Sequence, residues 1–370
     1  MVRLLLLAAV AAMSSAVATH ADEAAFYVGT FARESKETGI FRAELDLETG
    51  KLSPLQKVAD AKNPGFVTVS PDGRFLYAAM ELQGGAAGAF QIKGPGALHP
   101  LNEKSSSGSG ACHVSIAGNH VFIANYNGGN FAWFATEKDG KLKDSAGIVA
   151  FEGSGPDPKR QDKPYAHAVN ASPDGRHVYV CDLGTDSVWG FRLDPESSAL
   201  TATEPAAGRV PPGGGPRHMS FSPDGRFVYV NNEMGMSVST FARDAESGAL
   251  TLLQTLPTLP EGVSKDRSST AEILTHPGGR WVYVSNRGHD SITVFKVRDD
   301  GQLEFLENQP SVAKVPRGMG MDPQGKWLVV AGQDDGALVS FRVGEDGRLS
   351  KTDRLETNTV PVCVAFVPKS

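Results

Sequence analysis

The sequence predicts an all-β protein, a seven-bladed β-propeller whose blades are four-stranded antiparallel sheets. Three observations predict it. A turn of the type Ser-Pro-Asp-Gly-Arg recurs along the 370-residue chain, a second marker closes each repeat, and 41 glycines and 23 prolines are spread among short apolar runs. Repeats of about 40–50 residues with four strand-like runs are typical of propeller blades, each of which buries its faces only against its neighbours.

The recurring turn counts the units. Its proline occurs in five copies, and two degenerate copies complete the series; the seven positions are Pro71, Ile116, Pro173, Pro223, Pro277, Pro323 and Pro368. Successive positions are 45 to 57 residues apart, and the longest step contains an insertion at 152–164. A second marker, independent of the turn, closes each unit: a small residue, then any residue, then leucine. The leucines are Leu52, Leu98, Leu142, Leu200, Leu250, Leu303 and Leu349. Both markers indicate seven units.

Residues 216–255 show the elements of one unit in order. Apolar runs at 218–222 and 227–232 flank the recurring turn, and two more follow at 237–244 and 249–255. Alternation with a period of two and enrichment in β-branched and aromatic residues predict half-buried strands in each run.

The chain ends predict how the ring closes. The run 24–31 matches the second strand of other units, and a third strand begins at Gly39, whereas the last unit offers only a first strand at 361–366. We therefore expect the N-terminal strands to complete the last blade, so that no sheet edge is left open at the seam. A single propeller domain over 22–370 follows.

Residues 1–21 have the layout of a secretory signal peptide. Arg3 precedes the apolar run 4–13, and small residues allow cleavage after Ala18 or Ala21. No later segment approaches 18 apolar residues. We expect an exported protein, periplasmic or secreted, that is free of the membrane after signal cleavage; a retained N-terminal anchor is the alternative.

Charge and cysteine usage exclude several classes of partner and cofactor. The net charge is −6 and the Lys and Arg residues form no run, so we expect no nucleic-acid partner. Cys112, Cys181 and Cys363 are an odd number in apolar runs, which indicates buried free thiols. The chain also lacks a phosphate-cradling glycine motif, a zinc-type Cys/His cluster and a serine nucleophile elbow, so we expect no cofactor and no metal. We also expect a monomer.

Hairpin geometry localises a candidate site. Since the recurring turn joins strands one and two, the residues before strand one and after strand two lie together at the opposite rim of the channel. Polar residues gather at these positions: His113, His167, Arg217, His218, Glu272 and Arg317 before strand one, and Asn125, Asp182, Asn232, Glu233, Asn286 and Arg287 after strand two. A propeller channel is also the default ligand pocket of this architecture.

Some of these residues break the repeat. His167, Arg217, Glu233 and Arg287 stand where other units carry Gly, Leu, Met or Gln, whereas an architectural residue should recur. These four therefore predict a functional site at the channel mouth, with the other eight as candidate substrate-binding residues; a solvated, mutually neutralising ion cluster is the alternative. The residues that do recur predict structure: the turn Asp and Arg residues, and the tyrosines Tyr77, Tyr179, Tyr229 and Tyr283.

At these residues the sequence resembles the lactonase family of seven-bladed propellers, which includes bacterial cycloisomerase-type 6-phosphogluconolactonases and the fungal 3-carboxy-cis,cis-muconate lactonising enzyme. The resemblance covers 24–368. It is carried by YVGTF (27–31), NPGFVTVSPDGRFLYA (63–78), NYNGGN (125–130), PYAHAV (164–169), GPRHM (215–219), NNEM (231–234) and SNRGHDSI (285–292). It implies a lactone hydrolase acting on a small, anionic lactone, with His167, Arg217, Glu233 and Arg287 at the channel mouth.

Opening a lactone needs a base for water, donors for the carbonyl oxyanion and positive charge for an acidic substrate group. We expect Glu233 to act as general base or acid with His167 as its partner, and Arg217 and Arg287 to hold the oxyanion and the acidic group. The export signal leaves open whether that group is a phosphate.

Three alternative functions stay open. A muconate-type lactonising lyase would use the same residues, with Glu233 as proton donor to carbon. A Ca²⁺-dependent lactonase would use Glu81 and the oxygen ligands of the mouth. An exported binding propeller would have no catalysis. The insertion 152–164 enters the mouth just before His167, either as a solvated loop or as a lid.

Overall fold

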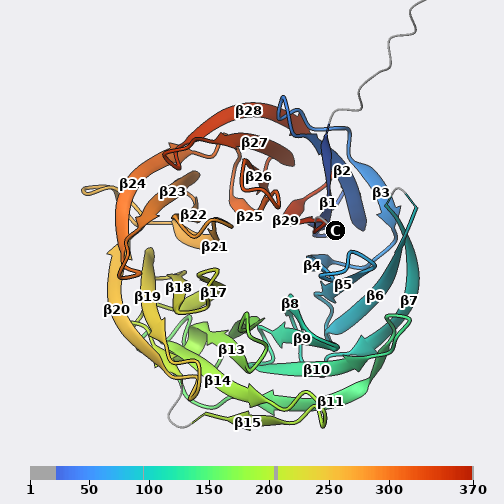
Figure 1. Ribbon diagram of the computed structural model, residues 1–370, viewed down its shortest axis with the longest axis vertical. Coiled ribbons are helices and arrows are strands. Elements are labelled where there is room, and N and C mark those ends of the chain that lie inside the picture. The colour runs from blue at the N-terminus through green and yellow to red at the C-terminus, as the bar shows by residue number, and fades with distance from the viewer. Residues whose placement is uncertain (1–21, 95, 204–206, 369–370) are drawn as a thin grey trace, which may run out of the picture.

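The computed structural model describes residues 22–94, 96–203 and 207–368, which form a closed ring of seven sheets around a central channel (Figure 1). The predicted seven-bladed propeller is confirmed. Every blade is a four-stranded antiparallel sheet, and one of them carries a short fifth strand. In the described residues the one helical element is a 3₁₀ turn at Leu183–Thr185. The signal peptide expected at 1–21 lies outside the described residues.

We number the blades along the chain. Blade 1 contains β4 (Pro64–Val69), β5 (Phe75–Met80), β6 (Ala86–Lys93) and β7 (Ala97–Ser105); blade 2 contains β8 (Ala111–Ala117), β9 (His120–Asn125), β10 (Asn130–Thr136) and β11 (Leu142–Ala150). Blade 3 contains β12 (Ala166–Ala171), β13 (His177–Asp182), β14 (Ser187–Leu193) and β15 (Leu200–Ala202), with β16 (Gly208–Arg209) also paired to β14.

The remaining blades follow the same order, with the first strand of each nearest the channel (Figure 1). Blade 4 contains β17 (Pro216–Phe221), β18 (Phe227–Asn232), β19 (Ser237–Arg243) and β20 (Leu250–Pro257); blade 5 contains β21 (Ser269–Thr275), β22 (Trp281–Arg287), β23 (Ser291–Val297) and β24 (Leu303–Pro310); blade 6 contains β25 (Pro316–Met321), β26 (Trp327–Gly332), β27 (Ala337–Val343) and β28 (Leu349–Glu356).

Blade 7 joins the two ends of the chain. Its strand order is β29 (Pro361–Phe366), β1 (Glu23–Thr30), β2 (Ile40–Asp46) and β3 (Gln56–Ala59). β1 pairs antiparallel with β29, with Phe26 opposite Phe366 and Val28 opposite Val364. The predicted closure by the N-terminal strands is therefore confirmed.

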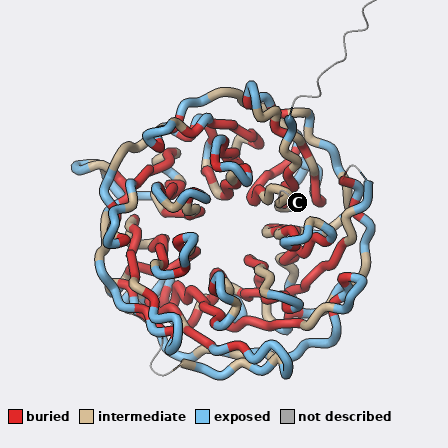
Figure 2. The backbone as a smooth tube through the Cα atoms, viewed as in Figure 1, coloured by how far each residue is buried: buried red, intermediate tan, exposed pale blue. Residues whose placement is uncertain are grey.

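Burial follows the position of a strand in its blade. The second strand β13 is buried along its whole length, whereas half of the residues of the outermost strand β20 are exposed and only one is buried. Figure 2 shows the same gradient, with buried chain inside the blades and exposed chain at the outer circumference. The core thus consists of the apolar faces between adjacent blades, so each blade depends on its neighbours for stability.

A recurring tyrosine connects neighbouring blades. The hydroxyls of Tyr27, Tyr77, Tyr179, Tyr229 and Tyr283 donate, at 2.9 to 3.2 Å, to the carbonyls of Gly96, Gly140, Gly248, Gly301 and Gly347 in the next blade. At Gly301, φ is 78° and an added Cβ would lie 2.3 Å from the Phe227 ring, so the turn requires glycine. The blade-packing role predicted for the tyrosines is confirmed.

The recurring turn is held by its own side chains. Ser222 Oγ donates to Asp224 at 2.6 Å and accepts from the Phe227 N–H, and Asp224 also accepts from the Arg226 backbone. Arg226 pairs with Asp224 in an exposed ion pair. These contacts confirm the structural role predicted for the turn residues.

Cys112, Cys181 and Cys363 are free thiols, as expected; two are buried and Cys112 is half-buried. No helix within the described residues has the length and apolar character needed to cross a membrane.

Candidate active site

Several of the predicted site residues lie in a bulge that every blade repeats. Each first strand loses register with its neighbour near its start, for example between Pro216 and His218 and between Pro316 and Gly318. A β-bulge leaves one residue outside the ladder and re-aims its side chain. The residues in these bulges are Gly65, Cys112, His167, Arg217, Ala271 with Glu272, Arg317 and Val362.

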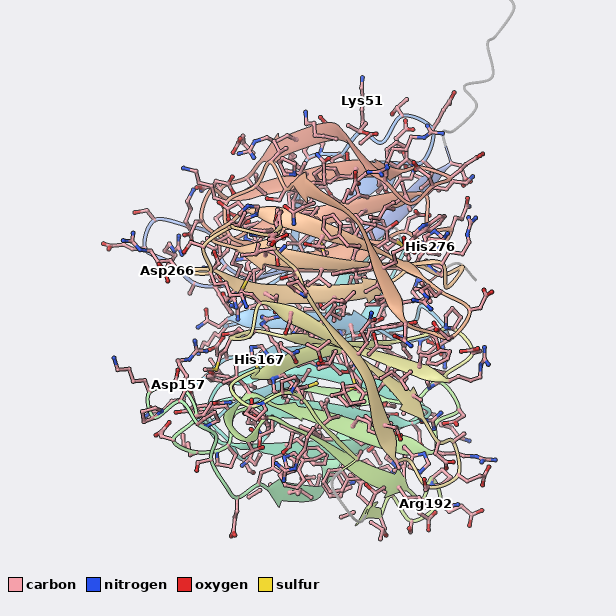
Figure 3. All side chains as sticks on the ribbon, turned by 90° about the vertical axis from the view of Figure 1, so that its left-hand side faces the viewer. Lys51, Asp157, His167, Arg192, Asp266 and His276 are labelled. Carbon is pink, nitrogen blue, oxygen red and sulfur yellow. The ribbon has the colours of Figure 1, made fainter. Side chains whose placement is uncertain are left out.

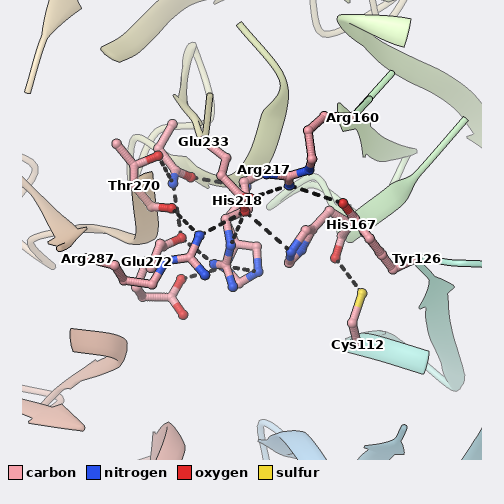
Figure 4. Close-up of polar contacts among 12 residues, drawn as sticks. Cys112, Tyr126, Arg160, His167, Arg217, His218, Glu233, Thr270, Glu272 and Arg287 are labelled. Atoms are coloured by element: carbon pink, nitrogen blue, oxygen red, sulfur yellow. Dashed lines mark hydrogen bonds and ion pairs between the residues drawn. The ribbon is translucent and has the colours of Figure 1, made fainter. Parts of the chain in front are cut away.

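The structure brings together the four residues that break the repeat. Glu233 Oε2 lies 3.2 Å from Arg217 Nε, 3.0 Å from Arg287 Nη2 and 3.9 Å from His167 Nε2 (Figure 4). His167 and Arg217 lie on β12 and β17, Glu233 directly follows β18, and Arg287 ends β22. Three consecutive blades therefore meet at one carboxylate.

The site lies at the rim opposite the recurring turns. In the side view of Figure 3, Asp157 and His276 lie toward opposite faces of the ring, and His167 lies toward the Asp157 face. His276 directly precedes the turn proline Pro277. Hairpin geometry had predicted this arrangement.

The backbone of Glu233 is fixed between blades 4 and 5. Its N–H donates to the Gly215 carbonyl at 2.7 Å, and its carbonyl accepts from the Thr270 N–H at 3.3 Å. Arg287 Nη2 also donates to the Thr270 carbonyl at 2.9 Å. The carboxylate and its arginines are thus held on rigid strand ends.

A further arginine contacts the carboxylate from the insertion 152–164. Arg160 Nη2 donates to Glu233 Oε1 at 2.7 Å and to the Tyr126 hydroxyl at 3.3 Å. Its side chain is 45% exposed, whereas that of Arg217 is 2% exposed. Arg160 was not among the site residues predicted from the sequence, although the basic residues Lys159, Arg160 and Lys163 of the insertion, just before His167, were a signal for it.

The arginines control the charge of Glu233. Burial alone would raise the pKa of its carboxyl, but the charges of Arg287, Arg217 and Arg160 outweigh that effect and hold the pKa at about 2. Glu233 is therefore a carboxylate over the whole physiological range.

His167 is a neutral imidazole. Burial, followed by the charge of Arg217, lowers its pKa well below the usual range. Its ring packs against Tyr126 and His218, with centroids 5.2 and 5.1 Å away, and its buried Nδ1 has no hydrogen-bond partner. The ring is held in place and keeps a free nitrogen.

A second layer lies beneath these residues, deeper in the channel. His218 Nδ1 lies 2.8 Å from Glu272 Oε1, and His218 Nε2 lies 3.2 Å from Arg217 Nη1. Because a guanidinium only donates, His218 Nε2 must accept and Nδ1 must carry the proton given to Glu272. Arg217 also donates to the Ala271 carbonyl. Glu272 thereby orients His218, which in turn supports Arg217.

Burial shifts the ionisation of this second layer. It raises the pKa of Glu272 to about 7 and lowers that of Arg217 to about 9. His113 completes the layer: its ring centroid lies 5.1 Å from that of His218, and its Nδ1 accepts from the Val169 N–H at 3.4 Å.

A cavity of about 390 Å³ lies below the second layer. His113, His218 and Glu272 line one end of it, and its lining also includes Ser220 of β17 and Pro71 of the recurring turn that follows β4. These three predicted residues therefore separate the mouth from the lower channel.

Arg317 is a further cation of the bulge ring. Its guanidinium lies over the Phe31 ring, 5.0 Å from the centroid. Within the described part of the chain, no carboxylate lies within ion-pair distance of it. Burial and the charge of Arg287 lower its pKa.

Four predicted substrate-binding residues lie outside the site. Asn125, Asp182, Asn232 and Asn286 are fully buried, and each bonds within its own blade or the segments beside it. Asn125 contacts Ser106 and Asn130; Asp182 accepts from Tyr165, Gly184, Thr185 and Trp189; Asn232 donates to Ser237 and Ser239; Asn286 donates to Ser291 and Thr293. They hold the hairpin ends, so we assign them no role with substrate.

A resident metal has no evident donor set. The described residues contain no group of three or more His, Cys, Asp or Glu side chains arranged to hold a metal ion. The oxygen ligands considered for Ca²⁺ include the four residues already engaged in the blades.

Comparison with known proteins identifies similar chains. The family model described as "Lactonase, 7-bladed beta-propeller" matches residues 25–366. A 6-phosphogluconolactonase of Bacillus subtilis is 34% identical over 302 residues, which cover 80% of this chain and 84% of the relative. A 6-phosphogluconolactonase of Formosa agariphila is 30% identical, covering 80% and 86%. The structure of a periplasmic gluconolactonase from Pseudomonas aeruginosa matches with a TM-score of 0.87 and 30% identity, covering 93% of this chain and 99% of the other.

Proposed function

The chain belongs to the lactonase family of seven-bladed β-propellers, and on that premise we propose that it hydrolyses a small sugar-acid or carboxylated lactone at the channel mouth. The observation that carries the proposal is the ionised Glu233 carboxylate, held beside a neutral His167 and among three guanidinium groups. This arrangement offers a base and oxyanion donors within one small volume.

The proposed reaction adds water to the lactone carbonyl. Glu233 accepts a proton from the attacking water while the water oxygen bonds to the carbonyl carbon. The negative charge that develops on the carbonyl oxygen is stabilised by Arg287, which is 14% exposed and whose Nε has no hydrogen-bond partner. When the ring C–O bond breaks, the alkoxide takes the proton back, and a hydroxy acid leaves.

The other residues support this step. His167 lies 3.9 Å from Glu233 and can receive or relay the proton, because its imidazole is neutral. Arg217 is nearly fully buried and bonded to Ala271 and His218, so its proposed role is to hold Glu233 in position. Arg317 and Arg160 add positive charge, which suits an anionic substrate.

We also propose that the mature protein is exported. The layout of residues 1–21 supports this, and the similar Pseudomonas aeruginosa protein is described as periplasmic. Fractionation of cells producing the full chain, with N-terminal sequencing of the product, should give an extracytoplasmic protein beginning between Thr19 and Asp22. A full-length cytoplasmic product would contradict export.

The test of the proposed function is turnover of two substrates. 6-Phosphogluconolactone and unphosphorylated gluconolactone should be offered separately, with acid release followed in a pH-stat and the product examined by NMR. A saturated hydroxy acid is the expected product. Absence of turnover on these and on a panel of carboxylated lactones would refute hydrolysis, and an unsaturated diacid from a carboxylated lactone would indicate a lyase.

A further inference from the structure

Glu233 is covered from solvent by one side chain of the insertion 152–164. Arg160 binds Oε1, whereas the closest contacts of Arg217 and Arg287 are to Oε2 (Figure 4). Arg160 is also far more exposed than either of them, at 45% against 2% and 14%. Glu233 itself is buried, so this pair is only partly exposed, but water can solvate the Arg160 guanidinium where it cannot reach that of Arg217. Arg160 is therefore the partner that can leave Glu233 most easily.

The backbone that carries Arg160 is firmly anchored. Gln161 is fully buried, and its Nε2 donates to the Leu183 carbonyl at 2.8 Å and to Asp186 at 2.7 Å. Asp157 Oδ1 accepts from the N–H groups of Lys159 and Arg160, at 2.8 and 3.2 Å. A displaced Arg160 guanidinium therefore stays within reach of the mouth, because only its side chain has to move.

The charge around Glu233 favours an anionic substrate. Three guanidinium groups surround this one carboxylate, and Arg317 adds a fourth, which forms no ion pair among the described residues although the charges of Glu81 and Glu233 act on it. A neutral lactone that displaced Arg160 would leave the guanidinium without its carboxylate. A lactone with a phosphate or carboxylate would offer a charge-assisted bond in exchange.

We propose that Arg160 determines the substrate preference of this site: it covers Glu233 in the free protein and transfers to the anionic group of an incoming lactone. The transfer frees Oε1 of Glu233 to accept the proton of the attacking water. Binding of the acidic group and exposure of the base are thereby coupled. This inference rests on the proposed hydrolysis and extends it to the selection of anionic over neutral lactones.

The test compares Arg160→Ala and Arg160→Lys with wild type on 6-phosphogluconolactone and on gluconolactone. Lys159→Ala is the matched control, because it removes one positive charge from the same insertion at a residue without a Glu233 contact. For Arg160→Ala we expect kcat/KM to fall about tenfold or more on the phosphorylated lactone and by less than about threefold on the neutral one. Arg160→Lys should retain part of the preference, and Lys159→Ala all of it.

Equal losses of kcat/KM on the two lactones, or the same loss in Lys159→Ala, would overturn the assignment. So would a wild-type protein that prefers the neutral lactone. If wild type turns over neither, the proposed hydrolysis fails, but binding still tests Arg160: calorimetry should show 6-phosphogluconate binding more tightly than gluconate, and Arg160→Ala should abolish that difference. An unchanged difference would overturn the inference independently of catalysis.

Discussion

Replacing Glu233 with Gln tests the centre of the proposed site. The change keeps the side-chain volume but removes the negative charge that Arg160, Arg217 and Arg287 share. If Glu233 is the base, kcat should fall by about 10²- to 10⁴-fold, the usual contribution of a positioned base. The arginines also lower the pKa of Glu233 from 4.5 to about 2, and that difference corresponds to roughly 3 kcal/mol of stability above pH 4.5. The variant should therefore be less stable as well as inactive.

Activity and folding must be measured on the same samples. Circular-dichroism melting gives the folded fraction at the assay temperature, and kcat is corrected for it. Glu81→Gln is the matched control, because Glu81 holds the equivalent position in blade 1, ten residues after its turn proline, and forms no ion pair in the described structure, although the charge of Arg317 acts on it. Its kcat should stay within about threefold of wild type. A folded Glu233→Gln variant whose kcat/KM matched wild type would refute the role of Glu233 in the chemistry.

Three further predictions concern the second layer, the blades and metal independence. Burial raises the pKa of Glu272 from 4.5 to about 7; the charged and titratable groups that face it are His113, His218, Arg217 and Arg317. The folded state therefore binds this proton more tightly than the unfolded state, and stability should fall as the pH rises from about 4.5 to about 7. Glu272→Gln should remove that fall in denaturant titrations at several pH values; an unchanged pH slope would show that another group causes it. Tyr229→Phe leaves the buried Gly301 carbonyl without its donor and should cost about 1 kcal/mol in urea unfolding while kcat is unchanged, and a loss of kcat without a loss of stability would contradict a purely structural role. Prolonged treatment with EDTA should leave lactonase activity intact, whereas activity that is lost and then restored by Ca²⁺ would support the calcium alternative.

The fold was predictable because its signals repeat. Seven turns and seven leucine markers gave the blade count, and the unmatched strands at the two ends gave the closure that β1 and β29 make. Each repeat supplies an independent copy of the same information, so the degenerate turns at Ile116 and Pro368 did not change the predicted number of blades. The offset from the turn proline also predicted the rim at which Arg217, Glu233 and Arg287 come together.

The site was only partly predictable, because the offset gives a rim but not a side-chain direction. His167 and Arg217 lie in bulges and reach the channel, whereas Asn232 follows the regular ladder of β18 and turns into its blade. Neither the bulges nor the hydrogen bonds of Asn232 change the spacing of these residues from the turn proline, so the sequence pattern does not reveal them. Arg160 was missed for a different reason: it lies in an insertion outside the repeat, where no equivalent position exists for comparison.

The excess of positive charge favours a ligand site over a self-neutralising ion cluster. A self-neutralising cluster would balance its charges, yet Glu233 faces three arginines, and Arg317 lies over Phe31 and forms no ion pair among the described residues, although the charge of Glu81 acts on it. Stability does not explain these buried charges, since well-packed apolar residues often stabilise a fold as much as buried ion pairs do. The pKa of Arg217, lowered to about 9, shows how strongly burial disfavours its charge. Arg217, Arg287 and Arg317 lie on strands of the blades, so the fold itself fixes this positive charge at one end of the channel, and we infer that the charge favours an anionic ligand.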